Sequence, residues 1–290
     1  MERIKRLIRE LSECQWLEKL DLRSWNMTRS TYQTPGQYED AAPLMEGLDL
    51  KRFPSSQGTT YFFRTQLDVP TAWLREPFGL VFESGGEGLL RVNGASYHGL
   101  DRNHTYVTLN PQVIGTSPEL EIELFDPVPE PVDPLNRQAV IQPPISSITS
   151  YLVRPNKPVQ SLMYTVTVIS EAALLLPEGD IRRIRLLKAL YGVMDRFANL
   201  EEDAIRVGEA ISATEKEFIQ QVQEIGENAQ GLEHMVGQSH IDIAWLWPMR
   251  ETVRKTSRTF STVDALMDEY PAYQYAQSQP LLFYFVKEND

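Results

Sequence analysis

Two residues of types that bind metal ions, His240 and Asp242, stand two positions apart near the carboxyl end of the chain. They follow residues 233–239, which the pattern predicts as a short buried strand. Residues i and i+2 of a strand project to the same side, so both side chains can reach one ion. Imidazole nitrogen and carboxylate oxygen are good ligands for Zn²⁺ or a similar divalent ion. The alternative is a buried histidine hydrogen-bonded to a neighbouring carboxylate, and a catalytic zinc site needs a third protein ligand.

The elements around this pair predict how it is positioned. Residues 248–270 have the spacing of a helix, residues 273–277 of a second strand, and residues 281–288 of another helix. This order is typical of the opening of a parallel α/β unit, in which active sites gather at the carboxyl ends of the strands. Trp245 is a natural platform for the apolar face of a sugar ring. Gln277 and Gln279, near the end of the second strand, are candidate substrate contacts.

The longer sequence around the pair resembles a known family. The string at residues 237–252 is GQSHIDIAWLWPMRET, followed by RTFS at 258–261 and YAQSQP at 275–280. It resembles the start of the catalytic domain of glycoside hydrolase family 38, the α-mannosidases, and is most similar to the cytosolic and vacuolar branch and its bacterial relatives. A weaker resemblance to the same branch lies upstream, in GEGL at 86–89, VNG at 92–94 and HGLDRNH at 98–104.

The resemblance implies roles for three residues. His240 and Asp242 would bind the active-site Zn²⁺, or another divalent ion such as Co²⁺, and Trp245 would line the subsite of the mannose being cleaved. The family retains anomeric configuration through two carboxyl groups, a nucleophile and an acid/base. The metal would bind two hydroxyls of the mannose and help distort its ring. The substrate class would be mannose-containing oligosaccharides or glycans.

No residue before 290 matches the family's nucleophile, acid/base or remaining metal ligands, so the catalytic carboxylates stay unassigned. We therefore expect the chain to be the N-terminal fragment of a longer α-mannosidase, with weak metal binding and no hydrolase activity by itself. Two other functions stay open. One is a non-catalytic carbohydrate-binding or scaffold protein that uses a β-sandwich. The other is an unrelated metallohydrolase on an α/β barrel, although barrels of the amidohydrolase type usually open with His-x-His.

The remaining patterns predict an α/β multidomain chain. We expect an N-terminal helix and extended arm at 1–57, a β-sandwich at 58–126, a Pro-rich and helical connector at 127–231, and the first two strand-helix units of a (β/α) barrel at 232–290. The helix, over residues 2–20, has an apolar stripe. Its members are Ile4, Leu7, Ile8, Leu11, Leu17 and Leu20.

Within the predicted sandwich, short β-rich runs are separated by turn residues. These runs are 59–69, 78–83, 88–92, 105–109 and 119–125, with a tight hairpin at Asn93-Gly94. Six prolines at 126–144 indicate an extended segment. Helices are expected at 181–194 and 201–225. We interpret Tyr61, Phe62, Phe63 and Trp73 as core rather than a sugar-binding face. We interpret His98 and His104 as loop residues, and His234 as too far along the strand to share the metal.

Composition excludes several partners. The formal net charge is −12, which disfavours binding to a phosphate backbone. No stretch approaches 18 apolar residues, so no membrane span is predicted. The charged N-terminus has no signal-peptide core, and one cysteine, Cys14, permits no internal disulfide, so we expect a cytoplasmic protein. The N-terminal helix can pack within one chain or between two copies, which leaves a homo-oligomer open.

Overall fold

The computed structural model describes residues 2–45, 50–128, 143–226, 233–245 and 247–289, and the chain divides into two compact units. The first unit, residues 1–19 and 153–233, is helical. The second unit, residues 20–152 and 234–290, contains two β-sheets and the carboxyl-terminal helices. Each unit is built from segments that are distant in the sequence, so neither coincides with one of the predicted domains.

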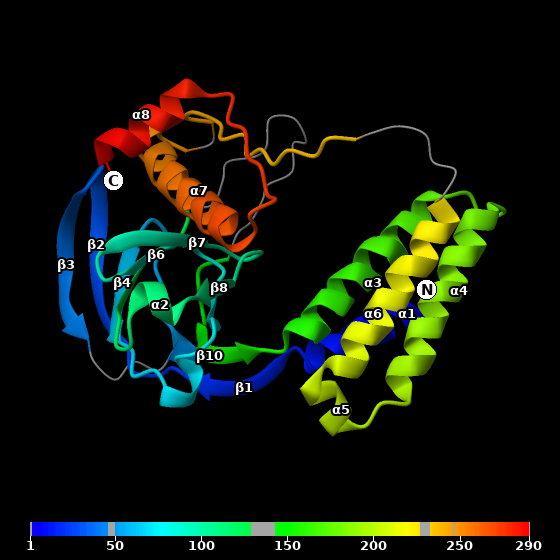
Figure 1. Cartoon of the computed structure of the whole chain (residues 1–290). Coiled ribbons are helices and arrows are strands. Elements are labelled where there is room, and N and C mark those ends of the chain that lie inside the picture. The colour runs from blue at the N-terminus through cyan, green and yellow to red at the C-terminus, as the bar shows by residue number, and fades with distance from the viewer. Residues whose placement is uncertain (1, 46–49, 129–142, 227–232, 246, 290) are drawn as a thin grey trace. The chain divides into compact units, whose positions relative to one another are not determined.

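Two antiparallel sheets dominate the second unit (Figure 1). Within the described residues, one sheet has the order β3-β2-β4-β9-β6-β7 and the other β1-β10-β5-β8. The strands of the first are β2 (Asn26–Thr34), β3 (Gln37–Met45), β4 (Thr60–Gln66), β6 (Glu87–Val92), β7 (Ala95–Leu100) and β9 (Glu119–Phe125). Those of the second are β1 (Trp16–Asp21), β5 (Phe78–Glu83), β8 (Tyr106–Leu109) and β10 (Thr149–Pro155). Short helical turns η1 (Leu50–Arg52), η2 (Thr71–Trp73) and α2 (Pro111–Ile114) connect them.

The six-stranded sheet separates an apolar face from a charged face. In β9, Leu120, Ile122 and Leu124 are buried in the hydrophobic core, while Glu121 and Glu123 alternate with them on the other side. The core also holds a set of packed aromatic rings, among them Trp25, Tyr61, Phe63, Trp73 and Phe82. Tyr61, Phe62, Phe63 and Trp73 are all buried, which confirms their interpretation as structural residues.

The local strand pattern is confirmed, but its extent is larger than predicted. Each of the five predicted runs contains a strand, and the Asn93-Gly94 turn joins β6 to β7 with φ of 51° and 83°. Both residues lie in the left-handed region that a type I′ hairpin requires. However, β2, β3 and β10 lie outside the predicted 58–126 sandwich and still pair in its sheets. Their partners are distant in sequence, so no local pattern could indicate them.

The helical unit is formed by α1 (Glu2–Glu13), α3 (Lys157–Leu175), α4 (Ile181–Ala198), α5 (Glu202–Val207) and α6 (Glu209–Gly226). Ile4, Leu7 and Leu11 of α1 are fully buried with residues of α3, α4 and α6. The predicted helix over 2–20 was too long, because Leu17 and Leu20 lie in β1. Strand pairing, which sequence periodicity does not record, ends the helix there. The predicted 201–225 helix is interrupted at Gly208, whose φ of 83° is left-handed.

The predicted Pro-rich connector is only partly described. Pro129, Pro131 and Pro134 lie outside the described residues, whereas Pro143 and Pro144 precede the segment that leads into β10. No helix in the described part of the chain is both long and apolar enough to cross a bilayer.

The last segment holds α7 (Met249–Glu269) and α8 (Pro280–Asn289), as predicted. In Figure 1, α7 (orange) lies against β7 and β6. The two predicted strands were wrong in extent. Only one parallel bridge joins them, between Gly237 and Tyr275. The parallel direction expected for a strand-helix-strand unit is present at this bridge, but the (β/α) barrel itself stays a prediction.

Candidate functional site

A cavity of about 550 Å³ lies in the second unit, where the β-sandwich meets the carboxyl-terminal segment. Three groups of residues line it. From the sandwich come the β6 start and the loop after β7, with Glu87, Asp101, Arg102, Asn103 and His104. From the carboxyl-terminal segment come Ser239, His240, Ile241 and Asp242, and from α7 and its N-terminal flank Trp247, Lys255 and Arg258. The predicted metal-binding pair therefore lines a cavity whose volume lies within the range of pockets that bind small ligands.

His240 and Asp242 point to the same side of the chain, as their spacing predicts. Nδ1 of His240 lies 3.5 Å from Oδ1 of Asp242, and the two side chains are 62% and 50% exposed. Two tetrahedral zinc ligands at their usual bond lengths stand about 3.4 Å apart. The pair therefore fits two positions of a divalent-ion site. Among the described residues no group of three His, Cys, Asp or Glu side chains could hold an ion.

Glutamine side chains hold the backbone that carries this pair. Gln279 accepts the N–H of Ile241 at its Oε1 (3.0 Å) and donates from Nε2 to the carbonyl of Ile241 (2.8 Å). Gln277 donates from Nε2 to the carbonyl of Ser239 at 2.7 Å. Gly237, just before, still bonds to backbone groups of residues 274 and 276. Beyond Gly237 the side-chain amides take the place of a strand ladder, which is why only one bridge forms.

Gln277 and Gln279, predicted as candidate substrate contacts, do not line the cavity, and their side chains bond to the backbone that carries the pair. Gln279 bonds to both backbone groups of Ile241, the residue between His240 and Asp242, and so helps to set the direction of both side chains. Substituting Gln279→Met, which keeps the length but removes both hydrogen bonds, is expected to weaken metal binding by about 10–100-fold, as for other groups that orient metal ligands. The measurement is a competition titration of Zn²⁺ with the full-length gene product.

Gln274→Met is the matched control for this substitution. Gln274 is exposed, and only its backbone carbonyl bonds to Gly237. Equal metal affinities for Gln279→Met and the wild-type protein would show that Gln279 does not position the pair.

Thr252 holds the loop that follows Asp242. It is fully buried, and its hydroxyl oxygen accepts the backbone N–H of Ala244 at 3.2 Å and the indole N–H of Trp247 at 3.1 Å. Ala244 has a φ of 55°, in the left-handed region that costs a non-glycine residue about 1 kcal/mol. The hydrogen bond to Thr252 helps to keep the backbone in that turn. The loop is thus fixed to the first turn of α7.

The two tryptophans of the motif differ in position. Trp245 is 50% exposed and is not among the residues lining the cavity, whereas Trp247 does line it. Nζ of Lys255 lies 4.5 Å from the centroid of the Trp247 ring, and Lys255 also binds both carboxylate oxygens of Glu87 (2.7 and 2.8 Å). Sequence reasoning therefore missed Trp247 and Lys255 as cavity residues.

The other three histidines occupy different surroundings. His98 is buried in β7, and its Nδ1 lies 2.5 Å from the carbonyl of Gly99. Burial lowers the pKa of His98. His234 is exposed and does not line the cavity. His104, interpreted from sequence as a loop residue, is in a loop, but that loop forms a wall of the cavity.

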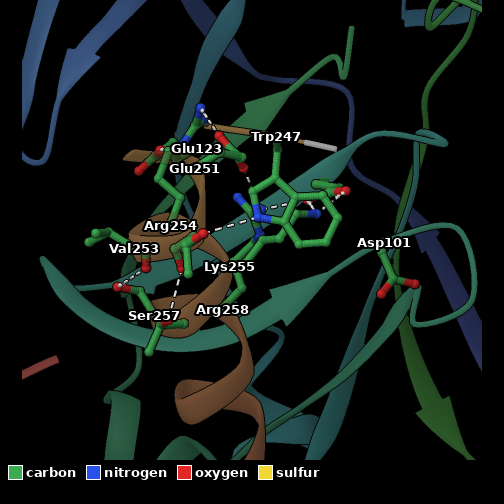
Figure 2. Close-up of polar contacts among 12 residues, drawn as sticks. Asp101, Glu123, Trp247, Glu251, Val253, Arg254, Lys255, Ser257 and Arg258 are labelled. Atoms are coloured by element: carbon green, nitrogen blue, oxygen red, sulfur yellow. Dashed lines mark hydrogen bonds and ion pairs between the residues drawn. The ribbon is translucent and has the colours of Figure 1, made fainter. Parts of the chain in front are cut away.

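A cluster of buried ion pairs joins α7 to the charged face of the six-stranded sheet (Figure 2). Arg254 donates to Glu123 of β9 (3.0 Å), to Glu251 (3.2 Å) and to the hydroxyl of Thr60 (3.2 Å). Its guanidinium also lies 4.5 Å from the ring centroids of Tyr32 and Phe125. The side chains of Arg254 and Glu123 are 6% and 5% exposed. Arg254 therefore anchors the start of the helix in the sheet.

A second part of the cluster is centred on Arg258. Its guanidinium pairs with Glu87 of β6 and with Glu251 (2.8 Å). Burial by itself would raise the pKa of Glu87, but the charges of Arg258 and Lys255 outweigh it and lower that pKa. The pKa of Glu123 is lowered in the same way, by Arg254 and Arg91 against the effect of burial. Glu87 and Glu123 are thus held ionised by the cationic side chains buried beside them.

Known proteins are similar in sequence to this chain, including the segment around this site. Residues 231–290 match the glycosyl hydrolases family 38 N-terminal domain. α-Mannosidase G of Dictyostelium discoideum is 26% identical over 80% of this chain and 22% of its own length. α-Mannosidase 2C1 of Mus musculus is 24% identical over 99% of this chain and 28% of its own length. The chain therefore spans about a quarter of the length of these relatives.

The solved structures that match the chain have low similarity to it. A β-glucuronidase from Ruminococcus gnavus has a TM-score of 0.31 and 12% identity, over 48% of this chain and 29% of its own. A β-glucuronidase from Bacteroides uniformis has a TM-score of 0.32 and 14% identity, over 48% of this chain and 18% of its own. The segment that contains His240 and Asp242, residues 231–290, is thus similar to the glycosyl hydrolases family 38 N-terminal domain.

Proposed function

We propose that this chain is part of a metal-dependent, retaining α-mannosidase that hydrolyses α-mannosidic bonds in oligosaccharides or glycans. The observation that carries the proposal is the position of His240 and Asp242. They lie in the segment that matches family 38, share one side of the chain and face the cavity. The relatives that match the chain are named α-mannosidases.

In this proposal His240 and Asp242 are two ligands of Zn²⁺ or another divalent ion. When bound, the ion supplies a positive charge that binds sugar hydroxyl oxygens and stabilises negative charge that develops on them. Gln277 bonds to Ser239, just before the pair, and Gln279 bonds to Ile241 between its two members, so the two ligands are oriented before the ion binds. Trp247, held by Thr252 and Lys255, provides an aromatic surface beside them.

The chemical step needs two carboxyl groups about 5–5.5 Å apart in a retaining glycosidase. Of the cavity's three carboxylates, Glu87 is paired with Lys255 and Arg258, Asp101 bonds to the loop residues Asn103 and His104, and Asp242 is assigned to the metal. We therefore assign no nucleophile and no acid/base to this chain. The third metal ligand is likewise unassigned. The described residues bring together only two possible ligands, His240 and Asp242.

A non-catalytic sugar-binding function of the sandwich is less favoured. It would use exposed aromatic rings, but Tyr61, Phe62, Phe63 and Trp73 are buried. A different metallohydrolase is disfavoured by the family match over the same segment that holds the metal-binding pair.

The proposal is tested by comparing two proteins with an aryl α-mannoside as substrate. The full-length gene product should hydrolyse the α-mannoside and lose activity with a chelator, with recovery on adding Zn²⁺ or Co²⁺. The 290-residue chain should show no turnover. In this proposal it supplies neither the nucleophile nor the acid/base carboxylate that the chemical step needs. The aryl β-mannoside is the control substrate. Turnover by the 290-residue chain would contradict the second expectation, and an inactive, correctly folded full-length protein would contradict the function.

A further inference from the structure

We propose that the loop Asp101–His104 of the β-sandwich forms a sugar-binding subsite, which takes the unit next to the mannose held at His240 and Asp242. This inference rests on the proposed function, because it assigns that same site a second subsite. It implies a preference for α-linked oligosaccharides of at least two units over glycosides with a non-sugar leaving group. The carrying observation is that this loop and the metal-binding pair line one cavity.

The loop has a fixed conformation. Oδ1 of Asp101 accepts the backbone N–H groups of Asn103 (2.6 Å) and His104 (2.9 Å). The N–H of Asp101 donates to the carbonyl of His104 at 3.1 Å. Nδ1 of His104 lies 2.9 Å from Oδ2 of Asp101. The shape of the loop therefore depends on the Asp101 carboxylate and on backbone groups, and not on the side chains of Arg102 or Asn103.

The position of the loop relative to the metal-binding pair is fixed as well. The loop follows β7, and β7 contacts α7 so closely that a Cβ on Gly99 would lie 2.7 Å from the carbonyl oxygen of Arg258. The N–H of Gly99 also donates to the hydroxyl of Thr262 at 2.9 Å. At its other end, α7 holds the loop after Asp242 through Thr252. One helix therefore fixes both walls of the cavity, and Figure 2 includes Asp101 in the same close-up as Trp247.

The side chains of the loop have the hydrogen-bonding groups that sugar hydroxyls require. Because Nδ1 of His104 faces the carboxylate of Asp101, we assign the proton of a neutral ring to Nδ1, which leaves Nε2 as an acceptor. Neither Nε2 of His104 nor the side chains of Arg102 and Asn103 have a hydrogen-bond partner within the described parts of the chain, and all three residues are exposed. The loop thus offers both hydrogen-bond acceptors and hydrogen-bond donors to a ligand in the cavity. This combination suits a ligand with many hydroxyl groups, because each hydroxyl can donate and accept.

The size and charge of the cavity favour a sugar chain over other ligands. Cavities of about 300–1,000 Å³ hold molecules larger than a single small ring, and this one is about 550 Å³. Hydrogen bonds from His104 and from the N–H of Asn103 outweigh the effect of burial and lower the pKa of Asp101. The lining carries both signs of charge, with Glu87, Asp101 and Asp242 balanced by Arg102, Lys255 and Arg258, which suits a neutral ligand with many hydroxyls.

The test uses the full-length gene product and two substrates, 4-nitrophenyl α-mannoside and α-mannobiose. The variant is Arg102→Ala/Asn103→Ala/His104→Ala, which keeps Asp101 and the backbone bonds of the loop. We expect kcat/KM for α-mannobiose to fall by about tenfold or more, mainly through KM, while kcat/KM for the aryl mannoside stays within about twofold.

Arg75→Ala/Glu76→Ala is the matched control, since both residues are exposed in the sandwich and lie outside the cavity lining. A Tm within about 2 °C of the wild type shows that the loop variant is folded. Equal losses on both substrates, or no loss on either, overturn this inference alone. A wild-type protein that cleaves neither substrate overturns the proposed function, and this inference with it.

Discussion

Substituting Asp242→Asn in the full-length gene product should lower both its affinity for Zn²⁺ and its kcat/KM for an aryl α-mannoside by more than about 100-fold. Substitutions that only orient a metal ligand cost about 10–100-fold, and Asp242 is proposed as a ligand itself. Asparagine has the same shape but no charge, so it removes the attraction to the ion and leaves the packing unchanged. Metal content after dialysis and initial rates are the two measurements.

The fold should survive this substitution. The Asp242 side chain is half exposed, and within the described residues its polar contact is with His240 at 3.5 Å. Asp264→Asn is the matched control, because Asp264 is an exposed carboxylate of α7 outside the cavity lining. If Asp242→Asn retains wild-type metal content and activity, Asp242 is not a ligand and the proposed site is wrong.

A second large effect is expected at Arg254, on stability. Arg254→Met should lower the free energy of unfolding of the second unit by about 3–5 kcal/mol, the usual cost of removing one partner from a buried ion pair. Glu251 and Glu123 would each lose a partner, although Arg91 still pairs with Glu123. Hydrogen exchange of peptides from α7 should then accelerate by about 100-fold or more, since every 1.4 kcal/mol is a factor of ten.

Arg250→Met, in the same helix, is the matched control, because the Arg250 side chain is exposed and its backbone carbonyl makes the contact to Tyr32. The double variant Arg254→Met/Glu123→Gln should recover part of the loss, because it removes the charge of a buried carboxylate that has lost one of its two arginine partners. If exchange in α7 is unchanged in Arg254→Met, the ion-pair cluster does not hold the helix on the sheet.

Much of the local structure could be predicted from the sequence. The strands β5 and β9, the Asn93-Gly94 hairpin and the helices α4, α7 and α8 follow from periodicity and turn residues. Several of the failures share one cause. Leu17 and Leu20 continue a helical stripe but lie in β1, and β2, β3 and β10 pair with strands far along the chain. Pairing between distant segments overrides local preference, and a local pattern does not record it.

The candidate site was also predicted only in part from the sequence. The spacing of His240 and Asp242 was sufficient to predict that their side chains lie close together, because side chains two positions apart on an extended backbone project to the same side. The Gln277 and Gln279 side chains were placed near the site, but their part in holding the backbone was not predicted. Nothing in the spacing indicates that a side-chain amide replaces a strand partner.

By itself the sequence determined which residues could bind a metal, that they share one side of the chain, and that their surroundings resemble family 38. Only the tertiary structure decided what faces them. The HGLDRNH segment is more than 130 residues upstream of His240, and it reaches the same cavity because Gly99 allows β7 to contact α7 closely and because buried arginines fix that helix on the sheet. Such contacts depend on close packing and on the pairing of buried charges, which act through space between residues distant in sequence.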